Sequence, residues 1–279
     1  MKYKRCFLLA SVLLLASALF FACKHDAGGG PDNPGPGGEE DKELPRNGSF
    51  LKVPKTENFS VLDPTKSSSS TDRVDVAIES FWMCEHEVTQ KEYKDTMGSL
   101  PSSPTTTGDN HPVDRVTWLE AINYCNRRST DDHLTQYYNI SGTTVTENPT
   151  ANGYRLPTAV EWEYAARAGI AGTLKYSGAE KPEDDNANEY GWYNGSNTHA
   201  VMGKKPNKWG FYDMSGNVAE LVYTAAAGTM GQKLALGDTA YRSRSDLVKR
   251  RVVDFTGDNG RNANDQDYIG FRVCRNVTE

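Results

Sequence analysis

Arg155-Leu156-Pro157-Thr158-Ala159-Val160-Glu161-Trp162-Glu163-Tyr164-Ala165-Ala166-Arg167 is the stretch that decides the fold. Thr158 is a suitable N-cap, and Glu161 three residues later completes a capping box. Together they predict a helix over Ala159–Ala168, with Gly169 as the residue that follows its C-terminus. Glu161 and Glu163 face different ways on such a helix. We therefore predict a capping residue and a salt-bridge partner rather than an acid/base pair.

Further helix signals lie upstream. Thr117 and Glu120 form a second capping box, and the apolar residues of Leu119–Arg128 recur at helical spacing. Thr89–Met97 is rich in helix formers and predicts a shorter helix.

The strand signals are short. Val74–Ile78 alternates and leads into Phe81-Trp82-Met83, which predicts strands. Tyr137–Val145 predicts a hairpin with Ser141-Gly142 as its turn. From Gly172 onward the chain is rich in Gly, Asn, Asp and aromatic residues, as in a loop-rich β region. The pattern predicts an α+β fold with two main helices and short antiparallel strands.

The N-terminus predicts export and a lipid anchor. Lys2, Lys4 and Arg5 precede the apolar run Phe7–Phe21, as in a secretory signal. The run ends at Cys23 in a loose match to a bacterial lipobox. We expect a signal peptide over residues 1–22 and lipidation of Cys23, with an uncut signal anchor as the alternative. A lipobox implies a bacterial envelope protein, and we expect display on the outer-membrane surface.

The next segment predicts a tether. Residues 23–45 are rich in Gly and Pro and then acidic, so they cannot bury an apolar core. We expect one folded domain over residues 46–279.

Composition excludes several classes of protein. The 279 residues include 10% aromatic residues, enough for a core, and the mean hydropathy of −0.66 excludes a protein with several membrane spans. A net charge of −6 and a pI near 5.5 argue against nucleic-acid binding. Removal of the signal peptide would take three basic residues and leave −9. Cys84, Cys125 and Cys274 form no CxxC pair, so we expect buried, inert thiols rather than a zinc or redox site.

A set of motifs in a fixed order is more specific than any one of them. They are Glu87-Val88-Thr89 with Tyr93; Pro112-Val113, Val116-Thr117-Trp118, Ala121 and Tyr124-Cys125; Arg155–Arg167; Pro206-Asn207, Trp209-Gly210 and Tyr212-Asp213-Met214; Gly216-Asn217-Val218 with Glu220; and Gly270-Phe271-Arg272. In this order they resemble the formylglycine-generating-enzyme (sulfatase-modifying factor) family. The resemblance covers Phe81 to Arg275 and implies an elaborated C-type-lectin fold.

The chemistry of that family does not carry over to this sequence. Its enzymes oxidise a substrate cysteine with two cysteines that precede Gly-Phe-Arg, whereas Leu221–Ile269 contains no cysteine here. Cys274 lies beyond Gly270-Phe271-Arg272, and the five histidines form no i, i+4 pair. We therefore expect no enzyme. The alternative is an enzyme or maturation factor of the same fold with a site in the Tyr190–Asn197 loop.

The C-terminal stretch departs from the family in another way. The usual Arg-Gly-Gly-Ser-Trp strand is missing, and residues 234–268 are idiosyncratic between intact motifs. This pattern resembles the variable proteins of diversity-generating retroelements, which display a rewritten ligand-binding surface on this fold. Mixed aromatic and polar groups suit recognition. The expected contact residues are Asp238, Ala240, Tyr241, Arg242, Ser243, Arg244, Asp246, Asp258, Asn259, Asp265, Asp267, Tyr268 and, from the preceding loop, Trp192.

One metal site is implied by the resemblance. Asp213 and Glu220 would supply side-chain oxygens and Gly216 and Val218 carbonyl oxygens to a structural Ca²⁺, which prefers such ligands. The alternative is a metal-free turn in which backbone amides satisfy both carboxylates.

Three functions remain open from sequence. The leading hypothesis is a lipid-anchored, non-enzymatic protein that binds an external ligand, either a protein or a surface molecule of a host or neighbouring cell. The others are the enzyme named above and a structural envelope lipoprotein with no diffusible ligand. We expect a monomer with no nucleic-acid partner.

Overall fold

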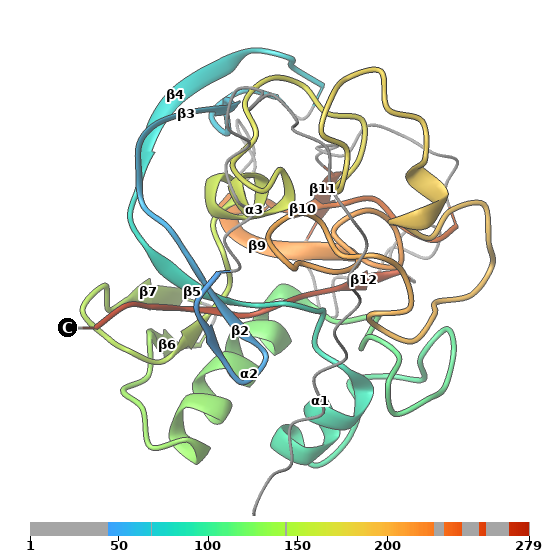
Figure 1. Cartoon of the computed structure of the whole chain (residues 1–279). Coiled ribbons are helices and arrows are strands. Elements are labelled where there is room, and N and C mark those ends of the chain that lie inside the picture. Colours follow the sequence, from blue (N-terminus) through green and yellow to red (C-terminus); the bar gives the residue numbers. More distant parts are fainter. Residues whose placement is uncertain are drawn as a thin grey trace, which may run out of the picture. The chain divides into compact units, whose positions relative to one another are not determined.

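The computed structural model describes residues 44–67, 69–142, 144–225, 232–241, 251–254 and 268–278, and all structural statements concern these residues. The elements, shown in Figure 1, are β1 (Arg46–Asn47), β2 (Phe50–Val53), β3 (Thr56–Leu62), β4 (Arg73–Ile78), β5 (Phe81–Cys84), α1 (Gln90–Met97), α2 (Trp118–Asp131), β6 (Tyr138–Ser141), β7 (Thr144–Glu147), β8 (Tyr154–Arg155), α3 (Ala159–Ala166), the 3₁₀ helix η1 (Ala187–Glu189), β9 (Ala219–Ala225), β10 (Gln232–Leu236), β11 (Arg251–Asp254), β12 (Ile269–Gly270) and β13 (Cys274–Asn276).

The main sheet joins the two ends of the domain. Its strand order is β1-β2-β5-β13-β8, and all neighbouring pairs are antiparallel. The last strand, β13, lies between β5 and β8, so that Cys274 faces Met83 on one side and Arg155 on the other. The domain therefore closes only when its C-terminal strand has been placed.

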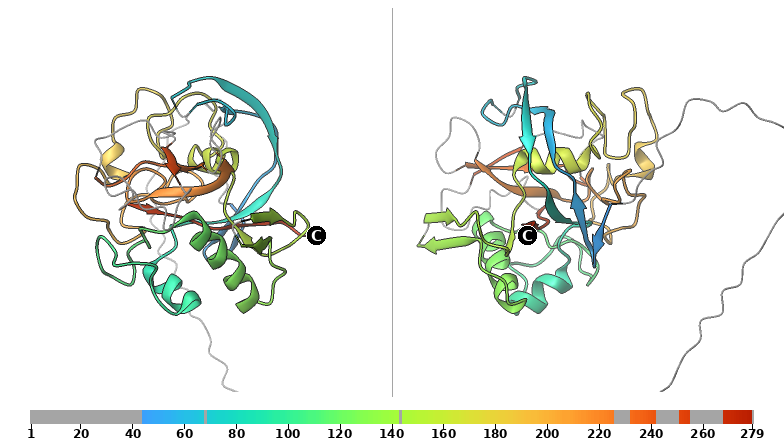
Figure 2. Two further views of the ribbon diagram at one scale, coloured as in Figure 1. Left: turned by 180° about the vertical axis from the view of Figure 1, so that it is seen from behind. Right: turned by 60° about the vertical axis from the view of Figure 1, so that its left-hand side comes forward.

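The other strands form three smaller sheets. One has the order β11-β10-β9-β12, in which β12 runs parallel to β9, and the others are the hairpins β3–β4 and β6–β7 (Figures 1 and 2). With three α-helices and mostly antiparallel short strands, the α+β prediction is confirmed. The predicted hairpin is present, but its turn lies one residue later than predicted, because Ser141 is the last residue of β6 and pairs with Thr144.

All three α-helices begin with a complete capping box. The boxes at Thr117 and Thr158 were predicted, and the third joins Thr89 to Glu92. Helix α3 ends at Ala166, two residues before the predicted end. The amide of Asn207 takes over there, because its Nδ2 donates to the carbonyls of Ala165 and Ala166.

The two glutamates of α3 have the structural roles that the sequence predicted. The carboxylate of Glu161 caps the helix and pairs with Arg155. Glu163 pairs with Arg73 and Arg167. Neither glutamate is available as half of an acid/base pair.

The main sheet is covered on both faces. Leu51, Met83 and Cys274 belong to one buried cluster together with the side chains of α3. Phe50, Cys84 and Val273 belong to a second cluster with those of α2. The three described cysteines are free and buried, as expected. No helix among the described residues is long and apolar enough to cross a membrane.

A wholly buried ion pair links the sheets to α3. Arg272 is 0% exposed, and its Nε and Nη2 each lie 2.6 Å from an oxygen of the Glu220 carboxylate. The indole Nε1 of Trp162 donates to the same carboxylate at 2.7 Å. Residues of α3, β9 and the segment between β12 and β13 are thus held at one point.

The remaining donors of Arg272 bind backbone. Its Nη1 donates to the carbonyls of Cys84 and Glu85, and its Nη2 donates to the carbonyl of Tyr212. We refer to Arg272, Glu220 and the groups bound to them as the hub.

We predict that Glu220→Gln lowers the free energy of unfolding by about 3–5 kcal/mol, because it leaves a buried guanidinium without its counter-charge. The control is Glu57→Gln in the exposed Lys55–Glu57 pair, which should cost less than about 1 kcal/mol. Urea unfolding at neutral pH measures both, and equal small losses would contradict the role of the hub.

Candidate functional site

A loop from Trp192 to His199 is closed at its base by two stacked rings. The indole of Trp192 and the imidazole of His199 have centroids 3.8 Å apart and planes 12° apart. The ammonium of Lys204 lies 4.1 Å from the centroid of the Trp192 ring. Burial is the largest cause of the lowered pKa of His199, and nearby His111 and Lys204 add to it.

Asn217 fixes this loop to the rest of the fold. Its backbone N–H donates to the Trp192 carbonyl, and its side-chain oxygen accepts from the backbone N–H of His199. Its carbonyl also accepts from the backbone N–H of Ala240. Asn217 has a positive φ of 59°, which asparagine tolerates better than most residues.

Gly216 allows the close approach of the loop. Its φ is 87°, and a Cβ there would collide with the backbone of Trp192. Only glycine fits this position.

The buried carboxylate of Glu87 holds Asn217 in turn. One oxygen accepts from Nδ2 of Asn217 at 2.7 Å and the other from the backbone N–H of Val218 at 3.1 Å. Burial and the carboxylates of Asp213 and Glu220 raise the pKa of Glu87 well above its usual range, against the opposing effect of Arg272. This interior therefore has a surplus of acidic groups around one guanidinium.

Two of the expected contact residues form an exposed aromatic pair. Tyr241 is 62% exposed, and its ring stacks on that of Tyr268 with centroids 5.9 Å apart. The hydroxyl of Tyr268 donates to the carbonyl of Ser196 at 2.6 Å, and the Gly195 N–H donates to the Ala240 carbonyl. We use the term rim for the loop Trp192–His199 together with Asp238–Tyr241 and Tyr268.

Two other expected contacts do not lie on the surface. Asp238 is 4% exposed and Ala240 is 1% exposed. The backbone of Ala240 is bonded to Asn217 and Gly195, which places its side chain inside the turn. For these two residues the prediction of a surface role was wrong. Backbone hydrogen bonds with Asn217 and Gly195 hold the segment that ends at Tyr241.

Of the other expected contacts, Trp192 alone lies among the described residues. Trp192 is half-buried at the base of the loop. Outside the described residues lie Cys23, Arg242, Ser243, Arg244, Asp246, Asp258, Asn259, Asp265 and Asp267. The sequence did not predict the contacts of His199 and Lys204 with Trp192. The only sequence feature that could have indicated them is their spacing from Trp192. The role of Glu87 was also missed, although Glu87 lies in a quoted motif.

The two expected calcium-binding carboxylates lie near each other and have protein partners. Both oxygens of Glu220 are bound to Arg272, which already supplies the positive charge. One oxygen of Asp213 accepts from the Met202 N–H. Among the described residues, no three His, Cys, Asp or Glu side chains are placed to hold a metal ion. Glu220 thus has the guanidinium of Arg272 as its counter-charge, and the calcium set that the resemblance implied stays a prediction.

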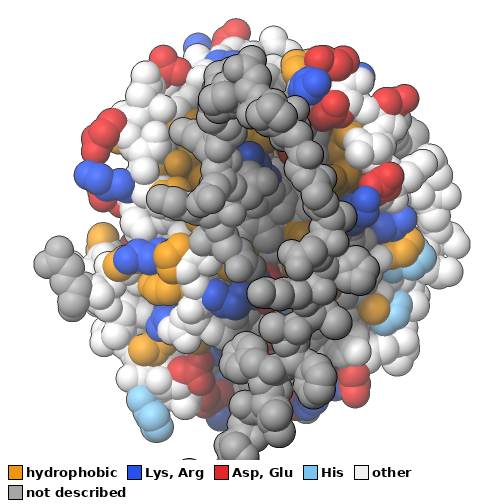
Figure 3. All heavy atoms as spheres, viewed as in Figure 1, with side chains coloured by type: hydrophobic (Ala, Val, Ile, Leu, Met, Phe, Trp, Pro, Cys, Tyr) orange, Lys and Arg blue, Asp and Glu red, His pale blue; other side chains and the backbone are white. Residues whose placement is uncertain are grey.

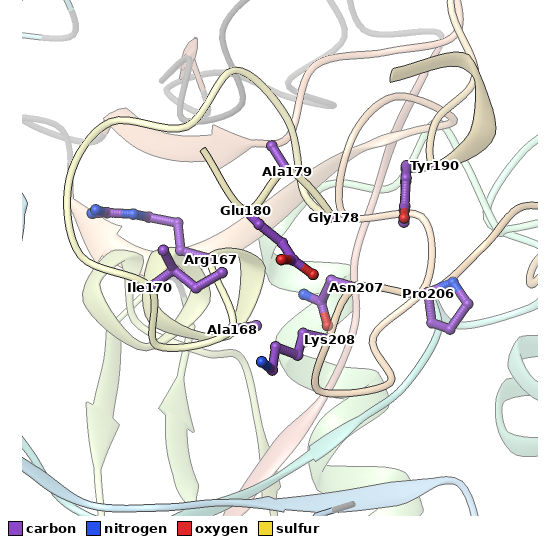
Figure 4. A pocket seen from close by; sticks show the side chains of 10 residues that line it. All are labelled: Arg167, Ala168, Ile170, Gly178, Ala179, Glu180, Tyr190, Pro206, Asn207 and Lys208. Carbon is purple, nitrogen blue, oxygen red and sulfur yellow. The ribbon is translucent and has the colours of Figure 1, made fainter. Parts of the chain in front are cut away.

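A separate cavity of about 170 Å³ lies beyond the C-terminus of α3. Figure 4 shows the side chains of Glu180, Asn207 and Lys208 near its centre and the guanidinium of Arg167 directed away from it. No Cys, His or Ser lines the cavity. It does not provide a nucleophile with an adjacent imidazole base.

On the face shown in Figure 3, acidic, basic and hydrophobic side chains of the described residues are interspersed. The hydrophobic ones form small groups rather than one broad patch. The described residues that are visible in this view therefore form no large apolar docking area.

We predict that Asp213→Asn stabilises the protein at pH 7.5. Burial raises the pKa of Asp213 from 3.8 to about 6. Its contribution to stability is therefore full below about pH 4 and is lost as the pH rises through about 6. The neutral amide should add up to about 3 kcal/mol at pH 7.5 and little at pH 4. Asparagine also suits the φ of 57° at this position.

Thermal melts at both pH values, with and without added Ca²⁺, measure this effect. If Asp213→Asn instead lowers the melting temperature, and does so only when Ca²⁺ is present, Asp213 is a calcium ligand and the pKa argument fails.

The comparisons with known proteins agree with this architecture. A family model described as "Sulfatase-modifying factor enzyme 1-like domain" matches residues 48–277. Chaperone protein LppX of Paenibacillus barcinonensis is 40% identical over 192 residues, which cover 56% of this chain. The chain spans 66% of the length of that relative.

Solved structures show the same fold. Treponema denticola variable protein 1 is 24% identical with a TM-score of 0.65, covering 82% of this chain and 94% of its own. CarF is also 24% identical, with a TM-score of 0.64 over 82% of this chain and 98% of its own. The resemblance to the Treponema protein supports the α+β architecture, and the family match spans nearly all of the described domain. This chain belongs to the family of sulfatase-modifying factor enzyme 1-like domains.

Proposed function

We propose that this protein is a non-enzymatic, lipid-anchored envelope protein that binds an external ligand at its rim. The ligand is a protein or a surface molecule of a host or neighbouring cell. The N-terminal signal, Cys23 and the Gly/Pro tether support anchoring in the bacterial envelope, on the outer-membrane surface.

One observation carries the proposal: the exposed Tyr241–Tyr268 stack. Tyr241 and Tyr268 flank residues 242–267 in the sequence, and their rings lie side by side. Tyrosine supplies a large, rigid contact area at a low cost in conformational entropy. A recognition surface requires such anchors next to adaptable polar groups.

The anchoring of the rim also supports binding. Asn217 holds the loop Trp192–His199 and the segment that ends at Tyr241 through backbone bonds. These bonds do not involve the side chains of residues 242–250 or 255–267. Changes in those side chains would therefore leave the bonds that hold the rim in place. This is the property expected of a surface diversified by a retroelement.

The reaction of formylglycine-generating enzymes is not part of the proposal. Leu221–Ile269 contains no cysteine, and the three described cysteines are buried. Burial raises the pKa of Cys125 and Cys274, the opposite of what a nucleophilic thiol requires.

The name of one relative favours a second candidate function. LppX, which is 40% identical to this chain, is named a chaperone protein. A chaperone of an exported protein would also be a non-enzymatic binding protein. Its ligand would be a folding polypeptide rather than a surface molecule.

We predict that grafting unrelated sequences of the same length onto 242–250 and 255–267 leaves the fold intact. The melting temperature should change by no more than roughly 3 °C, the shift that about 1 kcal/mol produces in a domain of this size. A scrambled Trp192–His199 loop is the control and should destabilise strongly. Grafts that fail to fold would contradict the separation of scaffold and contact surface.

We also predict a near-copy of the 3′ coding segment beside the gene. It should differ mainly at adenines and lie next to a reverse transcriptase gene, which sequencing of the locus would reveal. A locus without such a copy would mean that the rim is fixed in sequence, and the chaperone hypothesis would then gain weight.

A further inference from the structure

A second groove lies between α2 and β6. It has a volume of about 660 Å³. Its lining residues are Asn123, Asn126, Arg127, Thr130, Gln136, Tyr138, Asn139 and Ile140. In Figure 1 the β6–β7 hairpin lies next to α2. None of the residues of this groove belongs to the rim.

The helical wall of the groove is a polar stripe. Asn123, Asn126, Arg127 and Thr130 are spaced i, i+3, i+4 and i+7, so they share one face of α2. On an amphipathic helix the face turned toward a neighbouring element is normally apolar. Here it carries two amides, a hydroxyl and a guanidinium, which are hydrogen-bonding groups.

The opposite wall is the open edge of β6. Tyr137 accepts a bond from the backbone N–H of Asn148, so the odd-numbered residues of this strand direct their backbone groups toward β7. Tyr138 directs its groups the other way, into the groove. Its N–H donates to Oδ1 of Asn126 at 3.2 Å, and its carbonyl accepts from Nδ2 of Asn126 at 2.7 Å.

The side-chain amide of Asn126 therefore takes the place of a neighbouring strand for one residue. It forms the same pair of bonds that a peptide backbone would form. Ile140 comes two residues later and directs its N–H and C=O to the same side. Among the described residues these two groups have no hydrogen-bond partner. The edge is satisfied at Tyr138 and open at Ile140.

From this we infer that the groove binds an extended segment of another polypeptide, which adds to the edge of β6 as a further strand. The backbone of the segment would exchange hydrogen bonds with Ile140, and the side-chain amide of Asn139 would bind its peptide groups. The amides of Asn123 and Gln136 already donate to the Leu119 carbonyl and to Thr130, so they would offer only their oxygens. In this mode of recognition, main-chain hydrogen bonds provide the affinity and side-chain contacts provide the specificity. It therefore suits segments of varied sequence.

Charge selects among such segments. Of the eight lining residues only Arg127 is charged. Arg127 pairs with Asp131 in an exposed i, i+4 pair, which contributes little and is easily exchanged. A carboxylate on the incoming segment can replace Asp131, so acidic segments are preferred over basic ones.

The test uses the full-length, ¹⁵N-labelled chain and a synthetic probe, acetyl-Glu-Thr-Val-Thr-Val-Glu-amide. Titration should shift the backbone amide signals of Gln136, Asn139 and Ile140. The same peptide N-methylated at its four central residues cannot pair as a strand and should not shift them. Equal binding of both peptides, or shifts confined to Tyr241 and Tyr268, would overturn the inference.

Two variants test separately the contribution of the open backbone edge at Ile140 and that of the positive charge of Arg127. Ile140→Pro removes the open donor without breaking a ladder bond and should weaken binding about tenfold, as for one lost hydrogen bond. Arg127→Glu should weaken the acidic probe about fivefold and strengthen its lysine counterpart. Lys91→Glu, in the similar exposed pair with Asp95 on α1, is the matched control and should change neither affinity.

A thermal melt of each variant shows whether it is folded. If Ile140→Pro does not fold, the N-methylated peptide on the native chain still decides. Failure of this test leaves the rim proposal untouched, since the two surfaces share no residue.

Discussion

The complete burial of one guanidinium governs the arrangement of the domain. Arg272 must place its donors where oxygen acceptors meet, because an unpaired buried charge costs several kcal/mol. Those acceptors come from β5, from the loop at Tyr212 and from Glu220 on β9. These bonds hold the sheets and α3 together at one point, and Glu87, which holds Asn217 and through it the rim, lies beside that point.

The interior around the hub carries more acidic than basic groups, and one of the extra acidic groups, Glu87, has a structural role. Glu87 contributes no ion-pair oxygen to Arg272 and instead holds Asn217 and Val218. Burial and two neighbouring carboxylates raise the pKa of Glu87. Glu87 thereby orients the side-chain amide of Asn217, whose Nδ2 donates to Glu87 and whose Oδ1 accepts from the backbone N–H of His199. The backbone N–H of Asn217 also donates to the carbonyl of Trp192, which attaches the loop Trp192–His199. Stability and site geometry thus depend on the same few buried groups.

Features that depend on residues close together in the sequence could be predicted, whereas contacts between residues far apart in the sequence could not. The capping boxes at Thr117 and Thr158 depend on residues three apart and were predicted correctly. The hairpin that follows Tyr138 was also predicted, with its turn misplaced by one residue. The partner of Glu220 is 52 residues away, so the sequence pattern alone left it as a calcium ligand. The burial of Asp238 and Ala240 depends on Asn217 in another strand region, and no spacing rule indicates it. The pairing of Asn126 with Tyr138 was missed for the same reason.

The central claim is that Asn217 and the buried Glu87 beside the hub, rather than the idiosyncratic segments, hold the rim. Native-state hydrogen exchange tests it most directly, at the backbone amides of Gly195, Gly216 and Ala240, whose bonds tie the rim together. The account predicts that these amides exchange only when the whole domain unfolds, with the same free energy as amides in β5 and β13. Rapid exchange of the three amides by local opening, while the sheet stays protected, would contradict it.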